Sequence, residues 1–130
     1  MLNIIISILQ IGLAIGFVLF WTYFFLVENK KTEHSEIYLA FERSFPLPDL
    51  GWITPTLIIS AIGNISGQTY GIFFSIVSGG SLIFLGLLDL SFNAQQHQIK
   101  RKSDLLSSLA INIICLIFGI IFLVYGWIFY

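Results

Sequence analysis

The sequence predicts an all-α integral membrane protein: a four-helix bundle with a short interfacial amphipathic helix between the first and second transmembrane helices. Of its 130 residues, 57% are hydrophobic and 10% are charged, whereas soluble domains carry about 25% charged residues. Four apolar stretches are separated by short polar segments, and a helix needs about 20 apolar residues to cross the hydrocarbon core. No strand-like alternation is present, so helices are the structure that satisfies every backbone group in lipid.

These stretches define one membrane domain, residues 1–130. We expect transmembrane helices at about 2–27, 52–66, 69–92 and 105–130, with cytoplasmic loops at about 28–51 and 93–104. The second helix is short, and it spans the membrane only if Trp52 and the residues of the following turn lie in the interfaces. The first helix has no basic segment before it and exceeds the apolar length of a signal peptide, so we expect it to be retained.

The segment "TEHSEIYLAFERSF" of the first loop predicts the interfacial helix. Its apolar residues recur at i, i+4 and i+8, as in a helix lying on a membrane surface; they are Ile37, Phe41 and Phe45. Pro46 is expected to end this helix. "PLPDLGW" is then expected to turn the chain back into the membrane, with Asp49 or Thr54 capping the second transmembrane helix. We favour an anchoring role for the segment, with a gating or lid role as the alternative.

The distribution of basic residues predicts the orientation. All six Lys and Arg residues fall in the two loops at about 28–51 and 93–104: Lys30, Lys31, Arg43, Lys100, Arg101 and Lys102. Short loops rich in Lys and Arg stay cytoplasmic. Both termini are therefore expected on the outside.

Each expected transmembrane helix has one face of small or polar residues, which we call its polar stripe. Helices in a bilayer associate through close packing and hydrogen bonds, so the stripes should meet in the interior. Their members are Asn3, Ser7, Gln10, Ala14 and Trp21; Thr56, Ser60, Gly63 and Gly67; Gly71, Ser75, Ser78, Leu82, Gly86, Asp89 and Asn93; and Ser108, Asn112, Cys115, Gly119, Phe122 and Gly126. Gly12 and Gly16 form a GxxxG pattern on another face of the first helix. We favour internal packing for this pair, with a homodimer contact as the alternative.

The polar residues of the cytoplasmic half form the candidate ligand-binding site. The candidates are Asp89, Asn93, Glu28, Asn112 and Asp49. Asp89 is central because an ionisable residue inside a membrane segment indicates function. The structural alternative is a hydrogen-bonded cluster of Asp89, Asn93 and Asn112 that holds the helices in register.

Several classes of function are disfavoured by composition. Cys115 is the single cysteine, which excludes an intrachain disulfide and paired-thiol chemistry. Glu33, His34 and His97 lack the spacing of metal ligands, so we predict neither a metal nor a cofactor. The net charge is −1 and the basic run adjoins a membrane helix. We therefore predict no nucleic-acid partner.

The sequence favours a non-enzymatic membrane protein that binds or conducts a small ligand, either a cation, a proton or an amphipathic molecule. No residue is assigned as catalytic. The first alternative is a membrane-embedded enzyme that acts on a lipid-like substrate, with Asp89 and Glu28 as acid and base. The second is a structural subunit of a membrane complex. The expected partners are the lipid bilayer and a small-molecule or lipid ligand.

Overall fold

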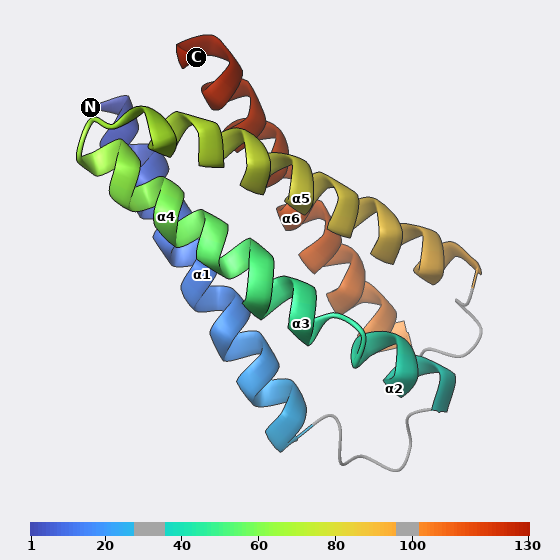
Figure 1. Cartoon of the computed structure of the whole chain (residues 1–130). Coiled ribbons are helices and arrows are strands. Elements are labelled where there is room, and N and C mark those ends of the chain that lie inside the picture. Colours follow the sequence, from blue (N-terminus) through green and yellow to red (C-terminus); the bar gives the residue numbers. More distant parts are fainter. Residues whose placement is uncertain (28–35, 96–101) are drawn as a thin grey trace.

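The prediction of an all-α chain with four long helices is confirmed. The computed structural model describes residues 1–27, 36–95 and 102–130, and this part of the chain contains helices and no strand. The α-helices, labelled as in Figure 1, are α1 (Leu2–Leu26), α2 (Glu36–Glu42), α3 (Pro46–Pro48), α4 (Thr54–Ile65), α5 (Thr69–Gln95) and α6 (Lys102–Phe129). A π-helical turn, η2 (Asp49–Ile53), joins α3 to α4.

Four helical segments of the described chain have the length and composition of membrane spans. They are Leu2–Leu26, Leu39–Ile65, Thr69–Gln95 and Leu106–Phe129. Such apolar helices suggest a multi-pass membrane protein. Figure 1 shows both termini at one end of the bundle, with α2 at the other end.

The second span begins earlier than its sequence suggests. Helices α3, η2 and α4 follow one another without a break, so "PLPDLGW" is helical and does not form a turn. The expected caps are also wrong: α3, η2 and α4 have no side-chain cap, and Thr54 donates its hydroxyl to the carbonyl of Asp49 instead. Proline fits the first turn of a helix because the N–H groups there make no intrahelical hydrogen bond, so the absence of an N–H in proline costs nothing. Pro46 therefore begins a helix here, and Asp49 lies within the second span.

The helices pack in the order α1, α4, α5, α6, each closely against the next, whereas α1 and α6 are not a closely packed pair. Glycines set two of these contacts. A Cβ on Gly63 would lie 2.5 Å from the backbone N of Gly71, between α4 and α5. A Cβ on Gly79 would lie 2.6 Å from the backbone N of Leu123, between α5 and α6. Small residues allow backbones to approach this closely in membrane bundles.

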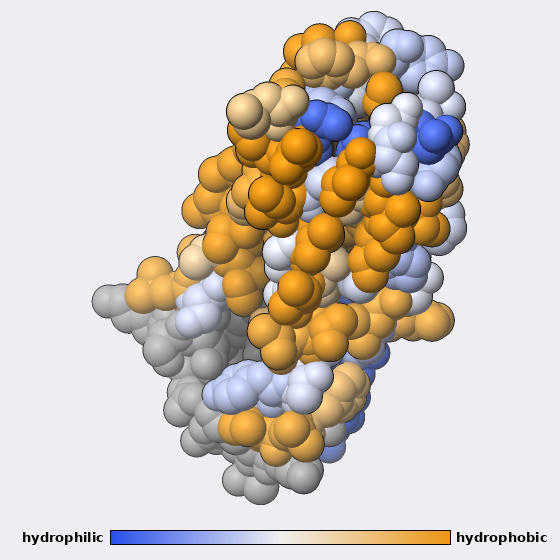
Figure 2. Space-filling model, turned by 90° about the vertical axis from the view of Figure 1, so that its left-hand side faces the viewer, coloured by the Kyte–Doolittle hydropathy of each residue, from blue (hydrophilic) through white to orange (hydrophobic). Residues whose placement is uncertain are grey.

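The polar stripes face the interior, largely as expected. The buried residues of α1 are Ile6, Ser7, Gln10, Ala14, Phe17, Trp21 and Phe24, and those of α5 include Gly71, Ser75, Ser78, Leu82, Gly86 and Asn93. Most of the coloured face in Figure 2 is hydrophobic, as a surface in contact with lipid tails would be. Gly67 is the exception: it is exposed in the α4–α5 turn with a φ of 69°, a conformation that glycine readily adopts.

The internal packing expected for Gly12 and Gly16 is wrong. Both glycines are exposed, and a Cβ on either would meet nothing within 4 Å in the described structure. The reason is geometric: this pair lies on the face of α1 opposite Gln10, and α4 packs on the Gln10 side. A homodimer contact through Gly12 and Gly16 stays a prediction.

One end of the bundle is held by a hydrogen-bonded network of Gln10, Ser60, Asn64 and Ser75, which we call the amide–hydroxyl network. Gln10 Nε2 donates to Ser60 Oγ at 2.8 Å and to Ser75 Oγ at 3.1 Å. Asn64 Nδ2 donates to Ser75 Oγ at 3.1 Å. All four side chains are buried, so the network ties α1, α4 and α5 together where water does not compete.

Candidate functional site

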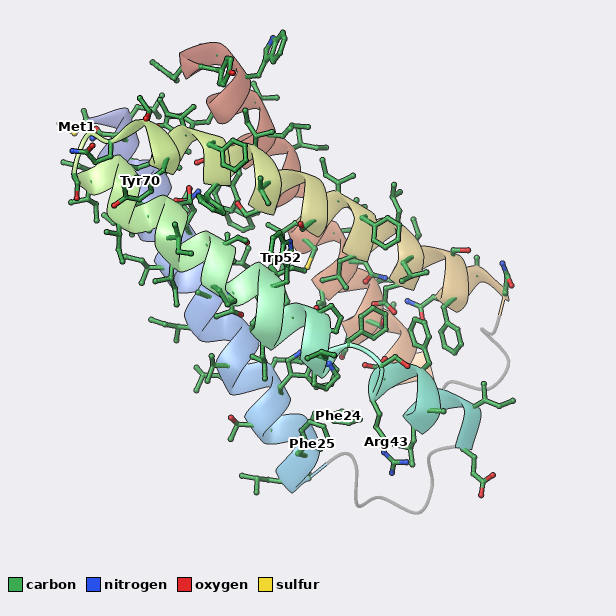
Figure 3. All side chains as sticks on the ribbon, viewed as in Figure 1. Met1, Phe24, Phe25, Arg43, Trp52 and Tyr70 are labelled. Atoms are coloured by element: carbon green, nitrogen blue, oxygen red, sulfur yellow. The ribbon has the colours of Figure 1, made fainter. Side chains whose placement is uncertain are left out.

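A cavity of about 270 Å³ lies at the other end of the bundle, lined by residues of α1, α2, η2, α5 and α6. It separates the end of α1 from the start of α6, the two helices that do not pack closely. Its polar wall includes Asp49, Asp89, Ser108 and Asn112, and its aromatic wall includes Phe20, Trp21, Phe24 and Phe45. Figure 3 labels Phe24 on α1, at the end of the bundle that also holds α2 and Arg43.

Asp49 is placed in this wall by the π-helical turn. Its Oδ2 accepts a hydrogen bond of 2.8 Å from the indole Nε1 of Trp21. Its Oδ1 is buried without a hydrogen-bond partner among the described residues, and the residue as a whole is 3% exposed. π-helical turns occur frequently at functional sites. Asp49, a residue of the cavity lining, therefore has one carboxylate oxygen that is fixed and one that is unpaired.

Asn112 of α6 supplies a complementary group. It is 2% exposed, and its Nδ2 has no hydrogen-bond partner in the described part of the chain. A buried polar atom left without a partner costs about 1–3 kcal/mol, and such an atom in a native structure calls for an explanation. The wall thus contains an unpaired donor on α6 as well as an unpaired acceptor on η2.

Asp89 belongs to a short hydrogen-bonded chain between α5 and α6. Asn93 Nδ2 donates to Ser108 Oγ at 2.9 Å, and Ser108 Oγ donates to Asp89 Oδ2 at 3.3 Å. Asn93 is buried and Asp89 is half-buried. This arrangement orients the Asp89 carboxylate at the cavity.

The aromatic wall is built from neighbouring residues of α1. Trp21 meets Phe20 edge-to-face with ring centroids 4.9 Å apart, and it meets Phe24 similarly at 5.2 Å. Such arrangements are favourable because the positive edge of one ring meets the negative face of the other. On α2, Phe41 stacks on Phe92 of α5 at 3.6 Å. Phe41 also meets Phe45 edge-to-face, with ring centroids 4.7 Å apart, and Phe45 packs with Trp21 and Phe24 of α1.

Three of the five predicted site residues line this cavity: Asp49, Asp89 and Asn112. Asn93 lies beside them and reaches Asp89 through Ser108. Glu28 lies outside the described residues. The alternative cluster of Asp89, Asn93 and Asn112 forms only in part, since the Nδ2 of Asn112 does not join it.

The Trp21–Asp49 bond and the aromatic wall were not anticipated. Trp21 belongs to the polar stripe that the sequence predicts for the interior face of α1, and an interior indole N–H needs an acceptor. That requirement is the one signal that points to a carboxylate near it. The position of Asp49 within a helix, which brings the two together, carries no sequence signal of its own.

The charged and metal-ligating side chains that line the cavity determine which kinds of molecule or ion it can bind. The described residues that line it include the acids Glu42, Asp49 and Asp89 and no Lys, Arg or His. No group of three or more His, Cys, Asp and Glu suited to a metal ion occurs in the described part of the chain. Glu33, His34 and His97 lie outside it. The site is an acidic, aromatic pocket within a bundle of apolar helices.

Comparisons of this chain with protein-family models, with curated proteins and with solved structures found no match.

Proposed function

We propose that this chain is a small multi-pass membrane protein that binds a small amphipathic ligand in the cavity between α1, η2, α5 and α6. The observation that carries the proposal is a pair of unpaired polar atoms, Asp49 Oδ1 and Asn112 Nδ2, on two residues that line the same cavity. Both belong to residues that are at least nine-tenths buried. A ligand that pairs with both atoms would offset the free energy that their burial costs.

The proposed orientation puts the cavity in the cytoplasmic half of the membrane. The loops rich in Lys and Arg follow α1 and α5, and Lys/Arg-rich loops stay cytoplasmic. The cavity is lined by the later residues of α1 and the early residues of α6, which is the loop end of both helices. A ligand would enter from the cytoplasm or from the inner leaflet.

This orientation is tested with single cysteines in a Cys115→Ser background. We expect a membrane-impermeant thiol reagent to label Ser66→Cys from the outside and Lys100→Cys from the cytoplasmic side. Labelling of both positions from the same side would contradict the four-span arrangement.

Ligand binding is tested by native mass spectrometry of protein extracted gently from its membrane. We expect a bound small molecule on the wild type and its loss from Cys115→Phe, because Cys115 lines the cavity and the added ring fills it. Ile113→Phe is the matched control: it adds the same ring to the same helix at an exposed position. Ser107→Trp fills the cavity from an exposed lining position and serves if Cys115→Phe does not fold.

A bound mass that persists in both cavity-filling variants, or that is absent from every sample, would overturn the proposal. The same experiment separates the alternatives. An enzyme acting on a lipid-like substrate is favoured by the two carboxylates that share the cavity, Asp49 and Asp89. It would convert the released molecule on incubation, whereas a binding protein would return it unchanged. A structural subunit would instead carry partner chains.

A further inference from the structure

The ligand class follows from the chemistry of the cavity wall, and the inference rests on the binding function proposed above. We propose that the cavity takes a small protonated amine with an aromatic or other apolar body, with the Asp49 carboxylate as its counter-ion and Asn112 as a donor to an oxygen atom near the amine.

The sign of the charge is the first step. The Asp49 carboxylate lines the cavity and is 3% exposed, and its Oδ1 has no hydrogen-bond partner among the described residues. Like charges at short range repel strongly where water is scarce, and opposite charges attract. A fatty acid or another anionic amphiphile is therefore disfavoured, and a cation is favoured.

The aromatic wall is the second step, since it favours an organic cation over a hydrated inorganic one. Phe20, Trp21 and Phe24 lie side by side on α1, and Phe45 faces them from the segment before α3. The negative face of an aromatic ring attracts an ammonium group, and tryptophan does so best. The same rings bury the apolar body of a ligand.

The unpaired atoms are the third step. Asp49 Oδ1 is an acceptor without a donor, and Asn112 Nδ2 is a donor without an acceptor. A primary amine supplies N–H groups to Asp49, whereas a quaternary ammonium has none to give. A hydroxyl or carbonyl oxygen next to the amine would accept from Asn112. A metal ion would satisfy the carboxylate but not the amide N–H.

The volume is the fourth step. The cavity measures about 270 Å³, just below the range of about 300–1,000 Å³ that is common for pockets of drug-sized molecules. A single ring with a short amine side chain fits such a space. A phospholipid does not.

The experiment uses Trp21 as its reporter. The chain has three tryptophans, and Trp52 and Trp127 are exposed at 54% and 76%. Trp52→Phe/Trp127→Phe protein in nanodiscs of zwitterionic lipid therefore reports on the cavity alone. It is titrated at neutral pH with 2-phenylethylamine, 2-phenylethanol and phenylacetate, which share a ring and differ in charge. Empty nanodiscs correct for partition into lipid.

We expect the amine to change the Trp21 fluorescence saturably, with a Kd at least about tenfold below that of the alcohol, and phenylacetate to give no saturable change. In Asp49→Asn the amine should lose this advantage while the alcohol binds as before, because the amide still accepts from Trp21. Asp49→Glu keeps the charge and should keep a preference for the amine. Circular dichroism confirms that the variants fold.

Equal binding of amine and alcohol, or tighter binding of phenylacetate, would overturn the amine assignment and leave the binding function intact. No saturable response to any of the three probes would overturn the amine assignment, whereas the binding function is overturned only by the outcomes of native mass spectrometry given above. An unchanged amine preference in Asp49→Asn would show that Asp49 is not the counter-ion.

Discussion

The indole Nε1 of Trp21 donates a 2.8 Å hydrogen bond to Oδ2 of Asp49, and both residues are almost fully buried. The bond joins α1 to the π-helical turn at the start of the second span. It also fixes one carboxylate oxygen and leaves the other free of partners among the described residues. This one hydrogen bond therefore links two elements of the bundle and fixes the orientation of the Asp49 carboxylate in the cavity lining.

Replacing Trp21 with phenylalanine tests the structural side of this contact. A buried hydrogen bond to a charged group contributes about 1.5–3 kcal/mol, so we expect Trp21→Phe to lower the free energy of unfolding by at least that amount. Reversible unfolding in mixed detergent micelles measures it. Trp52→Phe makes the same change at an exposed position and should stay within about 0.5 kcal/mol of the wild type.

The loss of ring volume in Trp21→Phe also costs stability, and a double-mutant cycle separates the two effects. In an Asp49→Leu background the acceptor is gone, so Trp21→Phe should cost less than it does in the wild type by about 1.5 kcal/mol or more. Equal costs in both backgrounds would mean that the hydrogen bond contributes nothing.

The close approach of α5 and α6 gives a second prediction, based on two adjacent glycines. Gly79→Ala would put a Cβ 2.6 Å from the backbone N of Leu123 and 2.7 Å from the carbonyl oxygen of Gly119. Backbone atoms cannot yield as a side chain does, so we expect destabilisation of about 1–3 kcal/mol. Gly80→Ala meets nothing within 4 Å and should be neutral or stabilising by up to about 1 kcal/mol. The same unfolding assay decides the matter; a Gly79→Ala that is no worse than Gly80→Ala would contradict the packing.

Periodicity explains how much of this fold could be predicted. In a bilayer, small and polar residues gather where helices contact each other. The spacing of Gly71, Ser75, Ser78 and Leu82 therefore predicts which face of α5 is buried, and the structure confirms that face. The same reasoning failed for Gly12 and Gly16. Spacing identifies a face that can pack closely, but whether a partner lies there depends on the order in which the helices pack.

The sequence predicts which residues form the candidate site better than it predicts their positions and contacts. The sequence predicts Asp89 as a site residue because an ionisable group in a membrane segment indicates function. It predicts Asp49 and Asn112 because they fall in the same cytoplasmic half as Asp89. The position expected for Asp49 is wrong: Pro46 and Pro48 predict a turn, but prolines can also begin a helix, and here they do. The Trp21–Asp49 bond depends on that helical position, so it could not be derived from either residue alone.

The amide–hydroxyl network gives a third prediction. Ser75 Oγ accepts from Gln10 and Asn64, lies 2.7 Å from Ser60 Oγ, and donates to the carbonyl of Gly71. Ser75→Ala removes all of these bonds from the interior, so we expect a loss of about 1–2 kcal/mol. The control is Ser81→Ala, because Ser81 is half-buried and donates to Val77 of its own helix. Its effect should be within about 0.5 kcal/mol. Comparable losses for the two variants would show that the network adds no stability.

Asn112 gives the prediction that separates function from stability. Asn112→Leu replaces a buried amide with an apolar group of similar shape and removes an unpaired donor, so we expect the free energy of unfolding without ligand to rise by about 1 kcal/mol. Asn64→Leu is the contrasting variant: Asn64 is equally buried, but its Nδ2 donates within the amide–hydroxyl network. The same substitution there should destabilise.

The gain in stability should be accompanied by a loss in binding, because a residue kept at a cost to the fold is expected to serve a ligand. In the Trp21 fluorescence assay, 2-amino-1-phenylethanol should bind the wild type more tightly than 2-phenylethylamine, since its hydroxyl oxygen can accept from Asn112. In Asn112→Leu that difference should disappear while 2-phenylethylamine binds as before. A variant that is less stable than the wild type, or that still prefers the hydroxylated amine, would show that the amide of Asn112 belongs to the fold and not to the ligand site.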